Sequence, residues 1–437
     1  MNNKRNRVVL VLGILAIAAG LFFVRFKITE DTDVAVDFPS FYYASKLTFE
    51  NGLTPYSASN WKLVEPLNTD AALFPFLYPP PSLLIFRPFV FLDYQTAQSI
   101  MVWLNHMLIL VFIYLFFIKI LGSKLDSLAL LPAIVYLYLF NPLLITINNG
   151  QVNLWLLVSI CLAWWGTKEK WHPFWIALPL AFGIILKVVP VLLLVIYLFK
   201  KEYKTILCVC AILIAFSAFA TLFLPEGIWQ DWVSSVAARG YAKDIGGVIT
   251  ATPANQSINA FTTRLFYGRN VRFDPLLRPP VWADQAPYIL SALVVLVSLA
   301  ATWRLSREGL NDPEVLGVHF CVWILVAFLV APFSWDHHLV HVLPAIYLSV
   351  RYAHKSRNGP LLVLACVTAL FLAYAFPSND PFLRRGVWTL LISSQLFAVG
   401  LLWLYFIYLS LFRLSVLPGR APHPNPDNPP SANLATP

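Results

Sequence analysis

The uncharged stretch TAQSIMVWLNHMLILVFIYLFFI, residues 96–118, decides the fold class of this chain. A transmembrane α-helix needs about 20 predominantly apolar residues, and stretches of this kind recur along the sequence. Apolar residues make up 59% of the 437 positions and charged residues 12%, whereas a soluble domain is roughly 25% charged. The composition therefore excludes a water-soluble fold and predicts an all-α, polytopic helical membrane protein with about twelve transmembrane helices.

Residues 77–92, LYPPPSLLIFRPFVFL, are the one apolar stretch whose assignment changes that count. They contain four prolines and a central Arg87. Proline breaks helices, and unpaired backbone groups are not tolerated facing lipid. We therefore expect an interfacial or re-entrant segment here rather than a full span.

The distribution of charge predicts the orientation. With a cytoplasmic N-terminus and twelve spans, the internal loops contain 17 of the Lys and Arg residues and 7 of the Asp and Glu residues, and the rest of the chain contains 14 and 15. Cytoplasmic loops carry the excess of basic residues. We thus expect a multi-pass protein of the bacterial plasma membrane with both termini in the cytoplasm. This asymmetry explains the net charge of +9 without a nucleic-acid partner.

The chain is expected to form one polytopic domain over residues 1–412. Two connections, 27–76 and 225–285, are too long to be simple turns, and loops of such length usually carry function. Both are predicted to be extracytoplasmic. The Pro-rich segment 413–437 has little to bury and is expected to be a disordered cytoplasmic tail.

Five polar clusters interrupt the apolar pattern, and in this topology all five fall on the outer face. Polar residues at membrane depth are costly and usually mark a site, so one extracytoplasmic active site is predicted. The clusters contain Asp37; Asn149, Gln151 and Asn153; Lys187; Asn255, Gln256 and Arg264; and Asp336, His337 and His338.

Three of these clusters also have a purely structural interpretation. Asp37 could cap the helix that follows it. The Asn-Gly turn at 149–150 could serve only as a turn. Lys187 could extend its ammonium to the membrane interface, although a lone lysine beside Pro190 is also well placed to bind a phosphate.

The histidines of the last cluster also raise the question of a metal. His337 and His341 are four residues apart, as on one face of a helix. However, no HExxH motif accompanies them, and the adjacent His337 and His338 point about 100° apart on a helix. We therefore expect hydrogen-bonding histidines, with no metal and no cofactor, and we assign no role to His341.

Taken in order, these motifs resemble glycosyltransferase family 87, whose members are polytopic enzymes of the GT-C fold. The resemblance covers roughly residues 30–350. It rests on VDFPSFYYAS around Asp37, G-x-x-PY at 52–56, F-x-YPP at 76–80, GQ-x-N at 150–153, K-x-x-P at 187–190, NQS at 255–257 followed by Arg264, and SWDHHLV at 334–340.

The resemblance implies an inverting glycosyltransferase that moves a hexose, with mannose the first candidate. The donor would be a polyprenyl-phosphate-linked sugar, and the acceptor an extracytoplasmic lipid or glycan. Asp37 would be the catalytic base, with Lys187, Arg264 and His338 facing the donor phosphate. The other residues expected to line the site are Tyr42, Tyr78, Asn149, Gln151, Asn153, Asn255, Gln256, Asp336 and His337.

Two alternatives stay open at this stage. A secondary transporter could have twelve spans, but it needs a site near the bilayer midplane that both sides can reach, and internal repeats, which this chain lacks. A polysaccharide ligase or polymerase would also act outside the cell on lipid-linked sugars. That alternative is favoured by a cluster of arginines in one outer loop: Arg239, Arg264, Arg269, Arg272 and Arg278.

Overall fold

The computed structural model describes residues 37–64, 74–123, 130–237, 250–267, 275–375 and 381–412. Residues 1–36, which include Asp31 and Asp33, and the predicted tail at 413–437 therefore lie outside the described residues. Within the described ranges the regular structure is helical, and the extended pairing there is one isolated antiparallel bridge between Asn255 and Trp335. The prediction of an all-α protein is confirmed.

In the described part of the chain, five helices are long and apolar enough to cross a membrane, or six if one bent pair counts as a span. The chain is therefore a helical membrane protein, whereas the predicted count of twelve is not confirmed. The five are α5 (Tyr94–Ile113) continued by η2 (Tyr114–Ile120), α11 (Tyr203–Thr221), α14 (Ala286–Ser306), α15 (Pro313–Val330) and α19 (Ser394–Phe412). The bent pair is α6 (Leu130–Leu139) with α7 (Asn141–Asn148), at an angle of 54°.

Prolines divide other apolar stretches into shorter helices. Pro142 lies in the first turn of α7, just after the break that separates this helix from α6. Pro190 lies in η3 (Val189–Leu193), between α9 (Pro173–Leu186) and α10 (Leu194–Phe199). The segment predicted not to span contains α4 (Ser82–Val90), which at nine residues is about 14 Å long and too short to cross the hydrocarbon.

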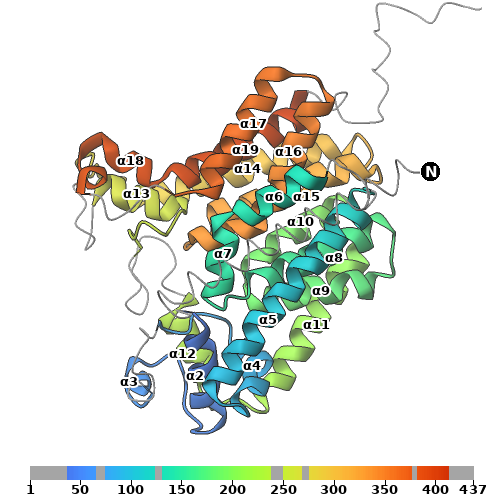
Figure 1. The fold of residues 1–437 in the computed structure, drawn as a ribbon. Coiled ribbons are helices and arrows are strands. Elements are labelled where there is room, and N and C mark those ends of the chain that lie inside the picture. Colours follow the sequence, from blue (N-terminus) through green and yellow to red (C-terminus); the bar gives the residue numbers. More distant parts are fainter. Residues whose placement is uncertain are drawn as a thin grey trace, which may run out of the picture.

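The remaining helices include those inside the two predicted outer loops. In Figure 1, α2, α3, α4 and α12 lie together at one end of the molecule. Helices α13 and α18 lie side by side, away from these four. Their bounds are α2 (Phe38–Phe49), α3 (Ala58–Trp61), α8 (Asn153–Lys168), α12 (Ile228–Ser235), α13 (Ile258–Phe266), η5 (Asp336–Val342), α16 (Leu343–Lys355), α17 (Gly359–Ala373), η6 (Pro381–Arg384), η7 (Gly386–Trp388) and α18 (Thr389–Ile392).

The helices differ in how deeply they are buried. In α15, 78% of the most apolar window is buried inside the protein, against 17% in α11. Helix α11 instead exposes large apolar side chains such as Leu207 and Ile214, as expected for a surface that faces lipid. A separate aromatic core joins α2 to α4 and includes Phe38, Phe41 and Phe86. The helix that follows Asp37 is therefore fixed in place by its own packing.

Candidate active site

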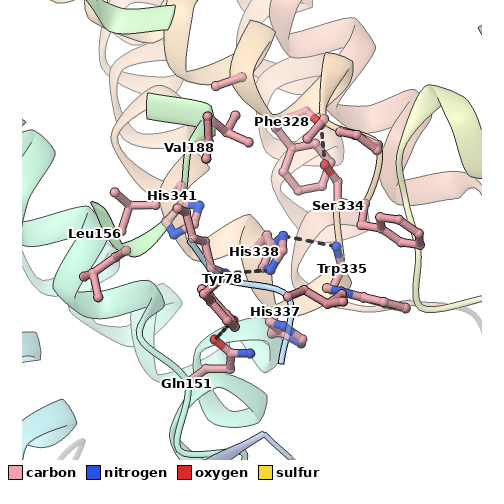
Figure 2. Close-up of a pocket in the computed structure, with 18 of the residues that line it drawn as sticks. Tyr78, Gln151, Leu156, Val188, Phe328, Ser334, Trp335, His337, His338 and His341 are labelled. Carbon is pink, nitrogen blue, oxygen red and sulfur yellow. Dashed lines mark hydrogen bonds between the residues drawn. The ribbon is translucent and has the colours of Figure 1, made fainter. Parts of the chain in front are cut away.

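A cavity of about 950 Å³ lies where the start of α2, the α7–α8 turn, the α9–η3 turn and η5 meet. Figure 2 shows Gln151, Tyr78 and His337 toward the lower part of this cavity, and Val188 and Phe328 toward the upper part. The cavity thus combines a polar region with an apolar one. The polar lining includes Asp37, Asn149, Gln151, Lys187, Asp336, His337, His338 and His341, and the apolar lining includes Leu156, Ile160, Val189, Leu193, Ile324 and Phe328.

The α7–α8 turn holds Asp37 at the cavity. Gly150 adopts a φ of +61°, and a Cβ at this position would lie 2.6 Å from Cβ of Phe38, so only glycine fits. The carbonyl of Asn149 accepts the backbone N–H of Phe38 (2.9 Å), and Nδ2 of Asn149 donates to Oδ2 of Asp37 (3.1 Å). The Asp37 side chain makes no capping hydrogen bond to α2. Its carboxylate is therefore oriented by Asn149 rather than used as a cap.

Lys187 lies in the turn after α9, and its ammonium points at the polar side of the cavity. Nζ donates to Oδ1 of Asn153 (2.6 Å) and lies 5.8 Å from the centre of the Tyr78 ring. Its second close contact is with Nε2 of His338, at 2.8 Å. Burial lowers the pKa of Lys187 to about 7, and the nearby Asp37 opposes this shift.

The protonation of His338 follows from its two contacts. Nδ1 accepts the backbone N–H of Trp335 (3.3 Å), so in the neutral ring the proton is on Nε2. An Nε2–H facing a charged Lys187 would place two donors against each other. The Lys187–His338 contact is thus a hydrogen bond when Lys187 is neutral, which agrees with the lowered lysine pKa. Burial, and then Lys187, also hold the pKa of His338 well below its usual range.

Tyr78 and Gln151 form one edge of the polar region. The Tyr78 hydroxyl donates to Oε1 of Gln151 (3.2 Å), and the Tyr78 carbonyl accepts from the Tyr56 hydroxyl (2.6 Å). Burial raises the pKa of Tyr78, which therefore stays protonated and acts as a hydrogen-bond donor. The hydrogen bond between Tyr56 and Tyr78 therefore joins the G-x-x-PY motif to the F-x-YPP motif.

Helix η5 brings the SWDHHLV motif against the α7–α8 turn. The His337 carbonyl accepts from Oγ1 of Thr146 (3.1 Å) and from Nδ2 of Asn153 (3.2 Å). Oδ1 of Asp336 accepts the backbone N–H of His337 (2.7 Å). Asn153 thereby links η5 to Lys187. Within the described ranges no group of three or more His, Cys, Asp or Glu residues is arranged to hold a metal ion.

Five predicted site residues lie outside the cavity lining, and one of them, Asn153, contacts the cavity residue Lys187 through its side chain. Arg264 is buried, and its guanidinium donates to the carbonyls of Thr252 and Asn255 (both 2.9 Å) and to the Ser393 hydroxyl (2.9 Å). These contacts hold the turn before α13. Burial lowers the pKa of Arg264 to about 9. The phosphate-binding role of Arg264 stays a prediction.

The other three make structural contacts. Asn255 accepts the backbone N–H of Ser334 at Oδ1 (3.0 Å), and the backbone N–H of Gln256 donates to the Ser334 carbonyl (2.6 Å). Both residues therefore fix the loop that leads into η5. The Tyr42 hydroxyl donates to the carbonyl of Leu92 (2.8 Å), within the aromatic core.

Several cavity residues were not expected from the sequence. His341 lines the cavity, as do the aromatic residues Trp232, Phe333 and Trp335. His341 follows His338 by three residues, and this spacing could have predicted from the sequence that the two imidazoles lie close together. The aromatic residues carry no such signal, because the sequence has 66 Phe, Trp and Tyr residues in all and most of them pack in cores or face lipid.

Comparisons with known proteins identify the family to which this arrangement belongs. The chain is 25% identical over 323 residues to the polyprenol-phosphate-mannose-dependent alpha-(1-2)-phosphatidylinositol mannoside mannosyltransferase of Mycolicibacterium smegmatis, covering 68% of each chain. It is 23% identical over 320 residues to the protein of that name in Mycobacterium tuberculosis, covering 69% of this chain and 67% of the relative. The model of glycosyltransferase family 87 matches residues 76–332, more than half of the sequence. The chain belongs to glycosyltransferase family 87.

Proposed function

We propose that this membrane glycosyltransferase transfers mannose from a polyprenyl-phosphate donor to a lipid or glycan acceptor outside the cell, with inversion at the anomeric carbon. The observation that carries the proposal is the cavity, which combines a carboxylate, a lysine–histidine pair and a long apolar lining. Such a donor has the same three parts: a sugar, a phosphate and an isoprenoid chain.

The two regions of the cavity fit the two ends of such a donor. The phosphate would bind at Lys187 and His338, where nitrogen atoms from two elements converge within 2.8 Å. The first isoprene units would follow the apolar lining of η3 and α15, which includes Leu193 and Phe328. A pocket that is mostly apolar with a few converging polar groups is typical of a small-molecule site.

The chemistry needs one base and one stabilised leaving group. The acceptor hydroxyl attacks the anomeric carbon and its proton passes to Asp37, acting as general base. The bond between that carbon and the phosphate oxygen breaks, and its electron pair stays on the departing polyprenyl phosphate. Lys187 and His338 would stabilise the negative charge that develops there. One displacement at carbon inverts its configuration and needs no covalent enzyme intermediate.

The remaining predicted residues would support this machinery. Tyr78, Gln151 and His337 line the cavity beside the phosphate position. Arg264 would act by holding the backbone around Asn255, and through it the loop into η5, rather than by touching the donor. Each of these roles is part of the proposal.

The site is proposed to face the outside of a bacterial plasma membrane, with both termini in the cytoplasm. Nucleotide sugars are absent there, so a lipid-linked donor is needed. A polysaccharide ligase or polymerase would use the same side and a similar donor and is kept as the second candidate. Membership in glycosyltransferase family 87 favours the transferase over a secondary carrier.

The test is a transfer assay with purified protein in lipid. Polyprenyl-phosphate mannose, polyprenyl-phosphate glucose and polyprenyl-phosphate arabinose, each radiolabelled in the sugar, are supplied with membrane lipid extract as acceptor. We expect label from the mannose donor to enter a larger glycolipid. Transfer from none of the three, together with vectorial uptake of a sugar into proteoliposomes, would overturn the proposal in favour of the carrier.

A further inference from the structure

His341 is a partly buried imidazole that lines the cavity and has no part in the proposed reaction as described above. It lies on η5, one turn after His338, and the two rings are nearly parallel, with centroids 6.0 Å apart and an interplanar angle of 26°. Figure 2 shows the His341 ring on the side of the cavity where Leu156 and Val188 lie. The ring thus stands between the polar and the apolar lining.

One nitrogen of this ring is left unused. The backbone of Asn153 hydrogen-bonds to His341 and favours its protonated form. Nε2, by contrast, is buried and has no hydrogen-bond partner among the described residues. A buried polar atom without a partner costs roughly 1–3 kcal/mol, so such an atom at a cavity indicates a ligand that completes it.

We propose that His341 is a further ligand of the donor phosphate, which it contacts through Nε2 beside Lys187 and His338. The inference rests on the proposed function and names one more residue of the same site.

The charges around the ring support an anionic ligand. Burial, Lys187 and His337 hold the pKa of His341 well below its usual range. An anionic phosphate would offset these effects, so the ring can take up a proton from water and donate Nε2–H to a phosphate oxygen. The same contact would strengthen as charge moves onto the leaving phosphate during transfer.

The alternative is that His341 only fills space against His338, and two substitutions separate these roles. His341→Phe keeps an aromatic ring of similar size but cannot donate a hydrogen bond. His341→Gln keeps a donor on a flexible side chain. The exposed His354 on α16 offers a matched control, His354→Phe.

The experiment measures dissociation constants of a short-chain polyprenyl phosphate and of the matching polyprenol with purified full-length protein. We expect His341→Phe to weaken binding of the phosphate about 10–100-fold while binding of the alcohol is unchanged. His341→Gln should lose less, and His354→Phe nothing. Unchanged phosphate binding in His341→Phe, or an equal loss for phosphate and alcohol, would overturn the role. A wild-type protein with no preference for the phosphate would overturn the proposed function as well.

Discussion

Basic side chains lie at two ends of this molecule and are used differently. At one end, which we call the basic end, Lys and Arg lie near the ends of helices η2, α8 and α16. Lys168 donates to the carbonyls of Lys119 and Ile120 (2.8 and 3.0 Å), and Arg351 pairs with Glu314 (2.9 Å). At the cavity end, Lys187 contacts a neutral amide and an imidazole. Lys168 and Arg351 are thus matched by carbonyls and a carboxylate, whereas the close partners of Lys187 are an uncharged amide and an imidazole.

Burial disfavours the charged form of Lys187. It lowers the pKa of this lysine to about 7, and the nearby Asp37 opposes the shift. An anionic ligand in the cavity would favour the charged form.

The difference between the basic end and the cavity end predicts that they lie on opposite faces of the membrane. Cysteine introduced at Ser59 or Ser234, both exposed near the cavity end, should react with a membrane-impermeant thiol reagent in intact cells, and one at the exposed Arg357 should not. Labelling is read by gel shift in a background without Cys210 and Cys366, which are exposed in the native chain. Reaction of the Arg357 site from outside would reverse the orientation.

The next largest effect is expected at Asp37. Asp37→Asn keeps the size of the side chain but cannot accept the proton of the acceptor, so the transfer rate should fall about 10²–10⁴-fold. Donor binding should stay near the wild-type value, because the phosphate contacts are elsewhere in the cavity. Asp31→Asn and Asp33→Asn serve as controls and should remain active. An active Asp37→Asn would show that Asp37 is not the general base. That result would fit a capping role instead, because Asn caps a helix about as well as Asp.

The depressed pKa of Lys187 predicts a pH dependence of donor binding. An anionic donor favours the charged lysine, so above pH 7 binding takes up a proton and the dissociation constant should rise about tenfold per pH unit. Below pH 7 the lysine is already charged and its contribution should be flat. Lys187→Arg should remove the part of the slope that comes from the lysine, because arginine stays protonated. The measurement is a titration of donor affinity from pH 6 to pH 9 (a range of about three units around the shifted pKa), and a slope that persists in Lys187→Arg would assign it to another group.

The smallest predicted effect concerns Arg264. Arg264→Ala leaves the carbonyls of Thr252 and Asn255 without their donor and should lower the free energy of unfolding by about 1–3 kcal/mol. Arg278→Ala, at an exposed position, should change it by less than about 0.5 kcal/mol. Thermal denaturation in detergent compares the two. A loss of donor affinity without a loss of stability would restore the phosphate-binding role predicted from the sequence.

The sequence predicted much of the cavity because its residues interrupt apolar stretches. Asp37, Asn149 and Lys187 cannot face lipid, and placing them on one side of the membrane was enough to suggest that they meet. Arg264 looks equivalent in the sequence, as a cation in an outer segment that follows the polar NQS motif. The difference is a tertiary one, because the carbonyls before α13 surround its guanidinium.

The positions at which helices break were also not predictable from the sequence pattern. Hydropathy identifies apolar residues but does not show where a helix breaks. In the structure the chain bends at Phe140, whose backbone is extended, and Pro142 in the first turn of α7 has no N–H with which to continue the hydrogen bonding of α6. That bend carries α7 to η5 and so brings Thr146 to the His337 carbonyl. A local sequence pattern does not show in which direction the chain continues after such a bend.

Lys187 is proposed to be the cation that binds the donor phosphate. The most direct test is the dissociation constant of polyprenyl-phosphate mannose for wild type, Lys187→Ala and Lys168→Ala. Removing a charged hydrogen-bond donor from the phosphate should weaken binding about 10–100-fold in Lys187→Ala, whereas Lys168→Ala should bind within about twofold of wild type. Wild-type affinity in Lys187→Ala, or an equal loss in Lys168→Ala, would contradict the account.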